Sequence, residues 1–423
     1  MKNDLYRRRI VDTKLDALLR VFGGVLIVGP KWCGKSWTAS NKANSEVFVD
    51  MADNKRRALL MPDSILDGLT PRLIDEWQDA PILWDTARRR IDREHRPGMF
   101  IFTGSAVPDF SESEMPSHTG TGRFASMRMR TLSLYEEEIS NGNVSLSALF
   151  DKKPFVPCTS EMDYMKALHL ICKGGWPASF WIQDADSSMM IASQYLNMVI
   201  NEDINRVDGI RRDSTLVRLF IRSLARNSAT TVRATSLKSD VSQRDGSDIS
   251  EQTIRSYYDA LKRIFVVEEQ DAWVPSLRSR SRIRSTPKRH FSDPSLAAAA
   301  LGATPEILAN DIKTAGFLFE TLCFRDLSVY MDALGGNVYH YHDKDELEAD
   351  AILQLPDGRW GAVEIKLGTF EFDNAASNLL RLKKKLADEI VPPSFLAIVT
   401  ASGAMAWERE DSVFVIPIDC IAP

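Results

Sequence analysis

The sequence has no apolar run close to the roughly 20 residues that a helix needs to cross a bilayer. Its N-terminus reads MKNDLYRRR, and no apolar stretch of the signal-peptide kind follows these charges. These absences argue against a membrane-spanning or secreted protein. We expect the chain to work in the cytoplasm, with no membrane partner.

Cysteine is scarce as well. Five cysteines stand at positions 33, 158, 172, 323 and 420 of 423, and no two form a CxxC pair. This spacing excludes the common zinc motifs and a disulfide framework. We expect reduced thiols, most of them buried as small apolar side chains.

A strong excess of one charge is missing over the whole chain, whose net charge is −5. Residues 206–290 are the exception, because they hold 18 Lys and Arg against 10 Asp and Glu. A basic segment within an acidic protein predicts a polyanionic partner at that segment.

Short apolar runs mark the first 140 residues, and segments of helical pattern separate them. The runs lie at 25–28, 47–49, 73–74 and 99–102. Apolar runs that alternate with amphipathic segments predict an α/β domain with a parallel sheet and crossover helices.

A glycine-rich loop follows the first run. Residues 29–36, GPKWCGKS, match the GxxxxGK[ST] pattern between a predicted strand and a predicted helix. Backbone N–H groups of such a loop surround phosphates, Lys35 reaches the β- and γ-phosphates, and Ser36 binds magnesium. ATP and Mg²⁺ are therefore the predicted cofactors. The predicted nucleotide-binding residues are Gly29, Pro30, Lys31, Trp32, Cys33, Gly34, Lys35, Ser36 and Trp37.

Polar residues at later strand ends complete this predicted site. Asp75 and Glu76 end the third run, and we expect Asp75 to hold magnesium through water and Glu76 to polarise the attacking water. The fourth run leads into Thr103 and Ser105; either can contact the γ-phosphate, and Ser105 is preferred. Arg123 follows on a glycine-rich loop and is predicted to reach the γ-phosphate of a neighbouring subunit. A structural ion pair is the alternative for this arginine.

These motifs together resemble the bacterial and archaeal AAA-type ATPases that carry a C-terminal domain of unknown function. The resemblance includes Tyr6-x-x-Arg9, the GGWP motif at 174–177 and the HFSDP motif at 290–294, and it covers nearly the whole chain. It implies a C-terminal PD-(D/E)XK nuclease-like fold and binding of branched DNA such as Holliday junctions. Trp32 and Cys33 depart from the usual loop of this family.

The C-terminal residues contain an acidic set of their own. A predicted helix carries Glu320, and a predicted hairpin carries Asp350, Glu364 and Lys366. Residues two apart on a strand share a face, so Glu364 and Lys366 point the same way. Asp350 and Glu364 can share a magnesium ion, Lys366 can position a water, and Glu320 completes the set. The alternatives are a solvated hairpin and a fold that binds DNA without cutting it.

The basic segment predicts a winged helix, with helices near 237–241 and 251–265 and strands at 266–267 and 273–274. Alternating arginines follow, and on a strand they would share one face that suits phosphates. A protein-binding surface is the alternative. The predicted DNA contacts are Arg278, Arg280, Arg282, Arg284, Lys288 and Arg289.

The predicted organisation has four parts. They are an AAA-type P-loop ATPase over 1–140, a linker and helical lid over 141–205, a winged-helix-like domain over 206–290 and a nuclease-like α/β domain over 291–423. We expect a ring homo-oligomer, such as a hexamer, that hydrolyses ATP and binds branched DNA. Two other functions stay open: an ATP-gated, Mg²⁺-dependent DNA nuclease, and an ATP-driven switch that binds protein.

Overall fold

The computed structural model describes residues 6–105, 120–182, 184–245, 249–275, 286–388 and 390–423. Within these residues, no helix is both long and apolar enough to span a bilayer. The chain forms two compact units. Unit 1 comprises residues 1–131, 201–212 and 259–266, and unit 2 comprises residues 132–200, 213–258 and 267–423.

Unit 1 contains a five-stranded parallel sheet, which confirms the predicted sheet type. Its strand order is β2 (Ser45–Phe48), β3 (Arg72–Asp75), β4 (Phe100–Gly104), β1 (Gly24–Val28) and β5 (Phe124–Arg128). The strand β4 therefore lies between β1 and β3. Because all five strands are parallel, the residues that follow β1, β3 and β4 meet at one edge of the sheet.

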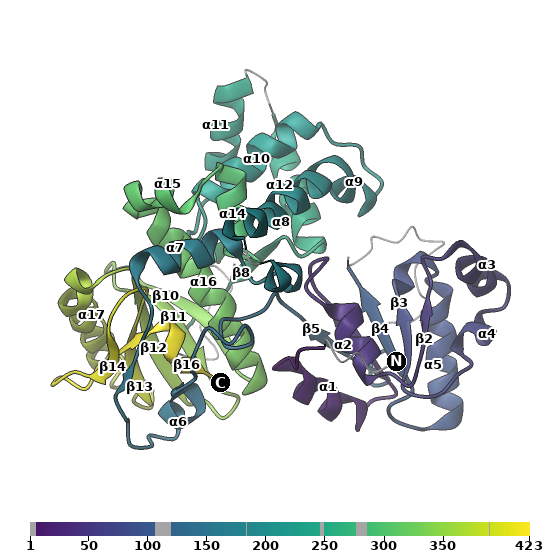
Figure 1. Ribbon diagram of the computed structural model, residues 1–423, viewed down its shortest axis with the longest axis horizontal. Coiled ribbons are helices and arrows are strands. Elements are labelled where there is room, and N and C mark those ends of the chain that lie inside the picture. The colour runs from purple at the N-terminus through teal and green to yellow at the C-terminus, as the bar shows by residue number, and fades with distance from the viewer. Residues whose placement is uncertain (1–5, 106–119, 183, 246–248, 276–285, 389) are drawn as a thin grey trace. The chain divides into compact units, whose positions relative to one another are not determined.

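Helices cover both faces of this sheet (Figure 1). One face carries α1 (Val11–Leu19) and α2 (Lys35–Lys42), and the other carries α3 (Ala52–Leu60), α4 (Pro62–Leu66) and α5 (Ile82–Glu94). Neighbouring strand residues alternate between the two cores, as Leu73 and Ile74 do. Both side chains are fully buried, which explains why these strands are apolar throughout.

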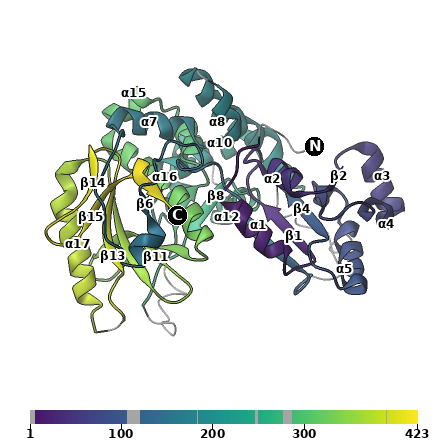
Figure 2. The ribbon, with the colours of Figure 1, turned by 60° about the horizontal axis from the view of Figure 1, so that its bottom comes forward.

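A seven-stranded sheet dominates the C-terminal part of unit 2. Its order is β10 (Asn337–His342), β11 (Glu348–Gln354), β12 (Trp360–Lys366), β13 (Phe395–Thr400), β15 (Phe414–Pro417), β14 (Met405–Glu408) and β7 (Cys158–Thr159). The first three strands are antiparallel, and β13 runs parallel to β12. The helix α17 (Phe372–Lys385) packs on one face and α16 (Ile312–Ala333) on the other (Figure 2).

Residues 141–160, predicted as a linker, are instead built into this unit. The strand β6 (Val144–Ser145) pairs with β16 (Ile421–Ala422), and β7 pairs with β14. Between them lies α6 (Leu146–Phe150). Glycine and proline do mark turns here, but strands of two residues carry no periodic pattern, so only the fold reveals their pairing.

Within the described residues, seven further helices lie wholly or partly in unit 2, and α12 continues into unit 1 at residue 259. They are α7 (Tyr164–Lys173), α8 (Ala185–Met198), α10 (Ser214–Arg226), α11 (Ala234–Asp245), α12 (Glu251–Arg263), α14 (Pro294–Leu301) and α15 (Pro305–Asn310). A π-helical turn (Val199–Asp203) and the short α9 (Ile204–Arg206) follow α8, and from residue 201 to residue 212 the chain belongs to unit 1.

The basic segment folds in the order helix, bridge, two helices and hairpin. After α10, Thr230 forms a bridge to Arg289; α11 and α12 come next, and then β8 (Val267–Gln270) pairs antiparallel with β9 (Lys288–Phe291). The helices were therefore predicted close to their positions. The second strand was not, because the partner of β8 begins at Lys288 and residues 273–274 form no strand.

Two motifs far apart in sequence meet in a buried network of unit 2. Asp293 accepts hydrogen bonds from the Gly175 backbone N–H and from Arg325, each at 3.0 Å. Arg325 also contacts Asp326 at 2.7 Å, and the Trp176 indole donates to Ser295. A Cβ at position 175 would lie 2.0 Å from the Leu132 carbonyl oxygen, so only glycine fits. These GGWP and HFSDP residues thus hold the unit together.

Candidate nucleotide-binding site

The glycine-rich loop joins β1 to α2, as the sequence predicts. Gly29 and Gly34 have φ values of 152° and 100°, and a Cβ at Gly29 would lie 2.1 Å from the Met129 carbonyl oxygen. The Lys35 ammonium is buried and donates to the carbonyl oxygens of Gly29, at 2.9 Å, and Pro30, at 2.8 Å. The charged group of Lys35 is therefore held by the backbone of the same loop that is predicted to bind phosphate.

The predicted magnesium ligands lie in direct contact. The Ser36 hydroxyl donates to Asp75 Oδ1 at 2.9 Å, and the Thr103 hydroxyl donates to the same carboxylate. Burial raises the pKa of Asp75, while Thr103, Ser36 and then Lys35 oppose that rise. A hydroxyl and a carboxylate are hard oxygen ligands of the kind that Mg²⁺ prefers, so these residues fit the ion.

Glu76 stands beside this group in a left-handed conformation with φ 52°. Its carboxylate accepts hydrogen bonds from the Gln78 amide and from the Ser105 hydroxyl, the latter at 3.3 Å. Burial raises the pKa of Glu76, and the negative charge of Asp75 adds to the rise. Thr103 and Ser105, the two sensor candidates, thus contact different acids. Gln78 was not predicted, although it lies in the same LIDEWQ motif.

Arg9, which was given no role from the sequence, and Lys31, which was predicted to bind nucleotide, both make contacts that hold the loop. Arg9 is 5% exposed and donates to the carbonyl oxygens of Cys33 and Arg130, each at 2.9 Å. Lys31 forms an ion pair with Asp203 at 2.6 Å. Arg9 of the N-terminal motif therefore contacts the phosphate loop directly, at the Cys33 carbonyl, and Tyr6 hydrogen-bonds to Asp12 and to Thr38 of α2.

Trp32 lies within the loop and Trp37 directly follows it, and each residue is 48% exposed. Cys33, in contrast, is buried, and its thiol donates to the Met129 carbonyl oxygen at 3.7 Å. The two tryptophans can therefore report on a nucleotide through their fluorescence.

Arg123 lies apart from this group. It precedes β5, its carbonyl accepts from the Gly24 N–H at 3.1 Å, and its guanidinium pairs with Asp92 at 2.7 Å. Gly24 begins β1, whereas the loop follows Val28 at the other end of the strand, roughly 16 Å away at ~3.3 Å per residue. Arg123 therefore cannot reach the loop of its own chain.

The predicted C-terminal residues do come together. Lys366 contacts Glu364 at 2.8 Å and Asp350 at 3.5 Å, and Lys288 contacts Glu320 at 2.6 Å and Asp350 at 3.4 Å. Burial raises the pKa of Glu320 to about 7, with Lys288 opposing it, and burial with the charge of Asp350 raises the pKa of Glu364 to about 8. Burial alone would also raise the pKa of Asp350, but Lys288 and Lys366 outweigh it, so this pKa is lowered.

The positions of Lys288 and Arg289 argue against the DNA contacts predicted for them. The Lys288 side chain is 13% exposed and faces carboxylates. Arg289 lies over the Tyr258 ring, with its guanidinium carbon 4.7 Å from the ring centroid, and donates to the Val232 carbonyl oxygen. Neither side chain is presented as a free surface cation. The other four predicted contacts, Arg278, Arg280, Arg282 and Arg284, lie outside the described residues.

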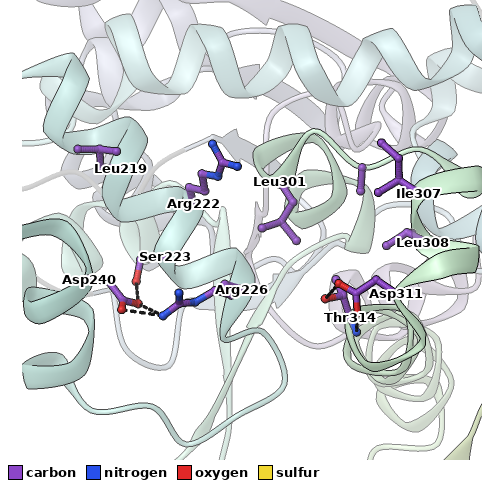
Figure 3. Close-up of a pocket in the computed structure, with 11 residues that line it drawn as sticks. Leu219, Arg222, Ser223, Arg226, Asp240, Leu301, Ile307, Leu308, Asp311 and Thr314 are labelled. Carbon is purple, nitrogen blue, oxygen red and sulfur yellow. Dashed lines mark hydrogen bonds and ion pairs between the residues drawn. The ribbon is translucent and has the colours of Figure 1, made fainter. Parts of the chain in front are cut away.

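Unit 2 also has an open pocket of about 580 Å³ (Figure 3). Its wall combines the apolar side chains of Leu219 and Leu301 with the exposed Arg222. Arg226 and Ser223 both bond to Asp240 there. The pocket contains none of the residues predicted for ATP, magnesium or DNA.

The loop, its helix, the acidic strand and the inserted strand form an N-terminal domain like those of P-loop ATPases. The comparison with family models agrees, because residues 22–137 match the AAA domain. Residues 166–307 and 315–421 match two domains of unknown function, DUF8612 and DUF4143.

Relatives along the whole chain are known from mycobacteria. An uncharacterised protein of Mycobacterium tuberculosis and one of Mycobacterium bovis are each 24% identical over 422 residues, which is 99% of this chain and 85% of each relative. Among solved structures, a Walker-type ATPase of Pyrococcus abyssi has a TM-score of 0.43 at 12% identity, covering 70% of this chain and 96% of its own. The Hef helicase domain of Pyrococcus furiosus has a TM-score of 0.21 at 11% identity, covering 95% and 91%. Neither structural likeness bears on function here.

Proposed function

We propose that this chain hydrolyses ATP with Mg²⁺ at the loop of residues 29–36 and uses the cycle to act on branched DNA. The contact of Ser36 and Thr103 with Asp75 carries the first part, because it joins the loop to two other strand ends. When ATP binds, Lys35 exchanges its loop carbonyls for phosphate oxygens. Ser36 and Asp75 would hold the magnesium ion, which would offset phosphate charge, and Glu76 would accept the proton of the attacking water.

Replacement of Lys35 by alanine tests this site. We expect ATP turnover to fall at least about 100-fold, because charge on the transferred phosphoryl group loses its nearest ammonium. Phosphate release and the tryptophan fluorescence change on adding Mg-ATP measure turnover and binding. The control is Lys42→Ala on the same helix, since Lys42 is 41% exposed and pairs only with Asp16 in the described contacts. Wild-type turnover by Lys35→Ala would exclude the assignment.

DNA binding is proposed for the winged-helix-like order of α10, α11, α12, β8 and β9. The positive excess of residues 206–290 and the alternating arginines at 278–284 support it. We expect a four-way junction to be retarded in gel-shift assays more strongly than duplex of equal length. Binding should weaken steeply as salt increases, because phosphate contacts release counterions.

A variant with glutamine at the four arginines of 278–284 is expected to bind the junction at least about 10-fold more weakly. The control replaces Lys383 and Lys384 by glutamine, at the end of α17, and removes charge elsewhere. If wild-type protein shifts no DNA with or without ATP, the protein-binding switch becomes the favoured function.

A further inference from the structure

Lys288 lies between two carboxylates of the acidic cluster in unit 2, which comprises Glu320, Asp350 and Glu364. Its ammonium lies 2.6 Å from Glu320 Oε1 and 3.4 Å from Asp350 Oδ1. On the opposite side, Lys366 lies 3.5 Å from Asp350 Oδ2 and 2.8 Å from Glu364. Asp350 is therefore held between two ammonium groups, one at each of its oxygens.

The backbone fixes Lys288 in this place. In the β8–β9 hairpin, Lys288 pairs in register with Gln270. The Gln270 amide donates to the Asp350 carbonyl at 2.9 Å and to the Tyr339 carbonyl at 3.0 Å. His290, two residues further along β9, is buried and bonds to the same glutamine side chain at 3.0 Å. The Gln270 hydrogen bonds thus fix the hairpin against β10 and β11. This attachment places Lys288 beside the carboxylates of Glu320 and Asp350.

The residues present do not fit a divalent cation. Mg²⁺ needs free oxygens at about 2.0–2.1 Å in octahedral geometry. Asp350 Oδ1 is engaged by Lys288, and Oδ2 accepts the Ile365 N–H at 2.8 Å besides contacting Lys366. An incoming ion would also meet two ammonium groups in contact with its ligands.

The arrangement of the carboxylates also argues against a divalent cation. Over the described ranges, the one group of three His, Cys, Asp or Glu whose ligand atoms all lie within 4.8 Å is His342, Glu346 and Glu348. All three are exposed and lie outside the cluster. Glu320, Asp350 and Glu364 do not meet this criterion together: Lys288 lies between Glu320 and Asp350, although Asp350 is close enough to Glu364 to raise its pKa.

We propose that the Lys288 ammonium takes the place of the divalent cation in this cluster, so the C-terminal domain holds its acids without metal. Each buried carboxylate would be unstable if left unpaired, and the lysines supply the compensating charge. The domain therefore does not cut DNA by metal-assisted hydrolysis. This disfavours the gated-nuclease function and leaves ATP hydrolysis and DNA binding unaffected.

Binding of Mn²⁺ to the full chain without nucleotide tests the proposal. Isothermal titration calorimetry and the electron paramagnetic resonance spectrum of Mn²⁺ should show no ion bound through Asp350 in the wild-type protein. Lys288→Met removes the charge at similar length, and we expect its Mn²⁺ affinity to rise at least about 10-fold. The gain should disappear in Lys288→Met/Asp350→Asn, which separates this cluster from the Ser36 and Asp75 site.

Lys313→Met is the matched control, because Lys313 is an exposed lysine on the helix that carries Glu320. It should gain no Mn²⁺ binding. Wild-type protein that binds one Mn²⁺, and loses it in Asp350→Asn but not in Asp75→Asn, would overturn the proposal. If Lys288→Met does not fold, the comparison of wild type with Asp350→Asn and Asp75→Asn still tests whether the cluster binds Mn²⁺. Failure of ATP hydrolysis would leave this result unchanged.

Discussion

Replacement of Glu76 by glutamine is expected to lower ATP turnover by about 100-fold or more while nucleotide binding persists. The amide matches the carboxylate in size and can still contact Ser105, but it cannot accept a proton from water. Lys35, Ser36 and Asp75 are untouched, so ATP should remain bound with its ion. Phosphate release measures the loss, and nucleotide extracted from the purified variant measures the retained ATP.

The matched control for this change is Asp79→Asn. Asp79 lies three residues further along, is 37% exposed and pairs with Lys55 at 3.4 Å. The Asp79→Asn substitution removes one negative charge from the same turn but leaves Asp75 and Glu76 unchanged. Turnover should therefore stay within about twofold of wild type. Near-normal turnover by Glu76→Gln would mean that another group polarises the water. Asp75 is then the nearest carboxylate to examine.

The contents of the ATP site could be predicted from sequence because each part is local. A glycine loop after an apolar strand, and acids or hydroxyls that end other apolar strands, are patterns of a few residues. What the pattern could not give was the insertion of β4 between β1 and β3. That order is set by pairing between distant segments, and it alone explains why Thr103 contacts Asp75.

Lys288 shows the limit more sharply. Its neighbours in sequence are basic, so charge patterning predicted a surface that binds phosphates. The acids that form ion pairs with Lys288 are Glu320 and Asp350, which lie 32 and 62 residues further along the chain. Counting charge along a chain cannot reveal a pair formed across two strands and a helix. The same reason hid the role of Arg9, whose partners lie on the loop and after β5.

Replacement of Arg123 by alanine is expected to lower ATP turnover about 1,000-fold, because a finger in trans stabilises charge on the transferred phosphoryl group. The affinity for ATP should change little, since Arg123 lies at the far end of β1 from its own loop. Phosphate release and tryptophan fluorescence measure the two quantities separately. Arg96→Ala is the control, because Arg96 is also an exposed arginine paired with an acid, Glu94, at 2.7 Å.

Mixing two inactive variants provides the sharpest test of this role. Glu76→Gln keeps the finger and loses the acid, whereas Arg123→Ala keeps the acid and loses the finger. In a cyclic assembly, a random one-to-one mixture places an intact acid against an intact finger at about one quarter of the interfaces. Turnover should therefore recover on mixing and subunit exchange. A mixture that forms mixed assemblies and stays inactive would show that Arg123 serves its own subunit, and the ion pair with Asp92 would then be its function.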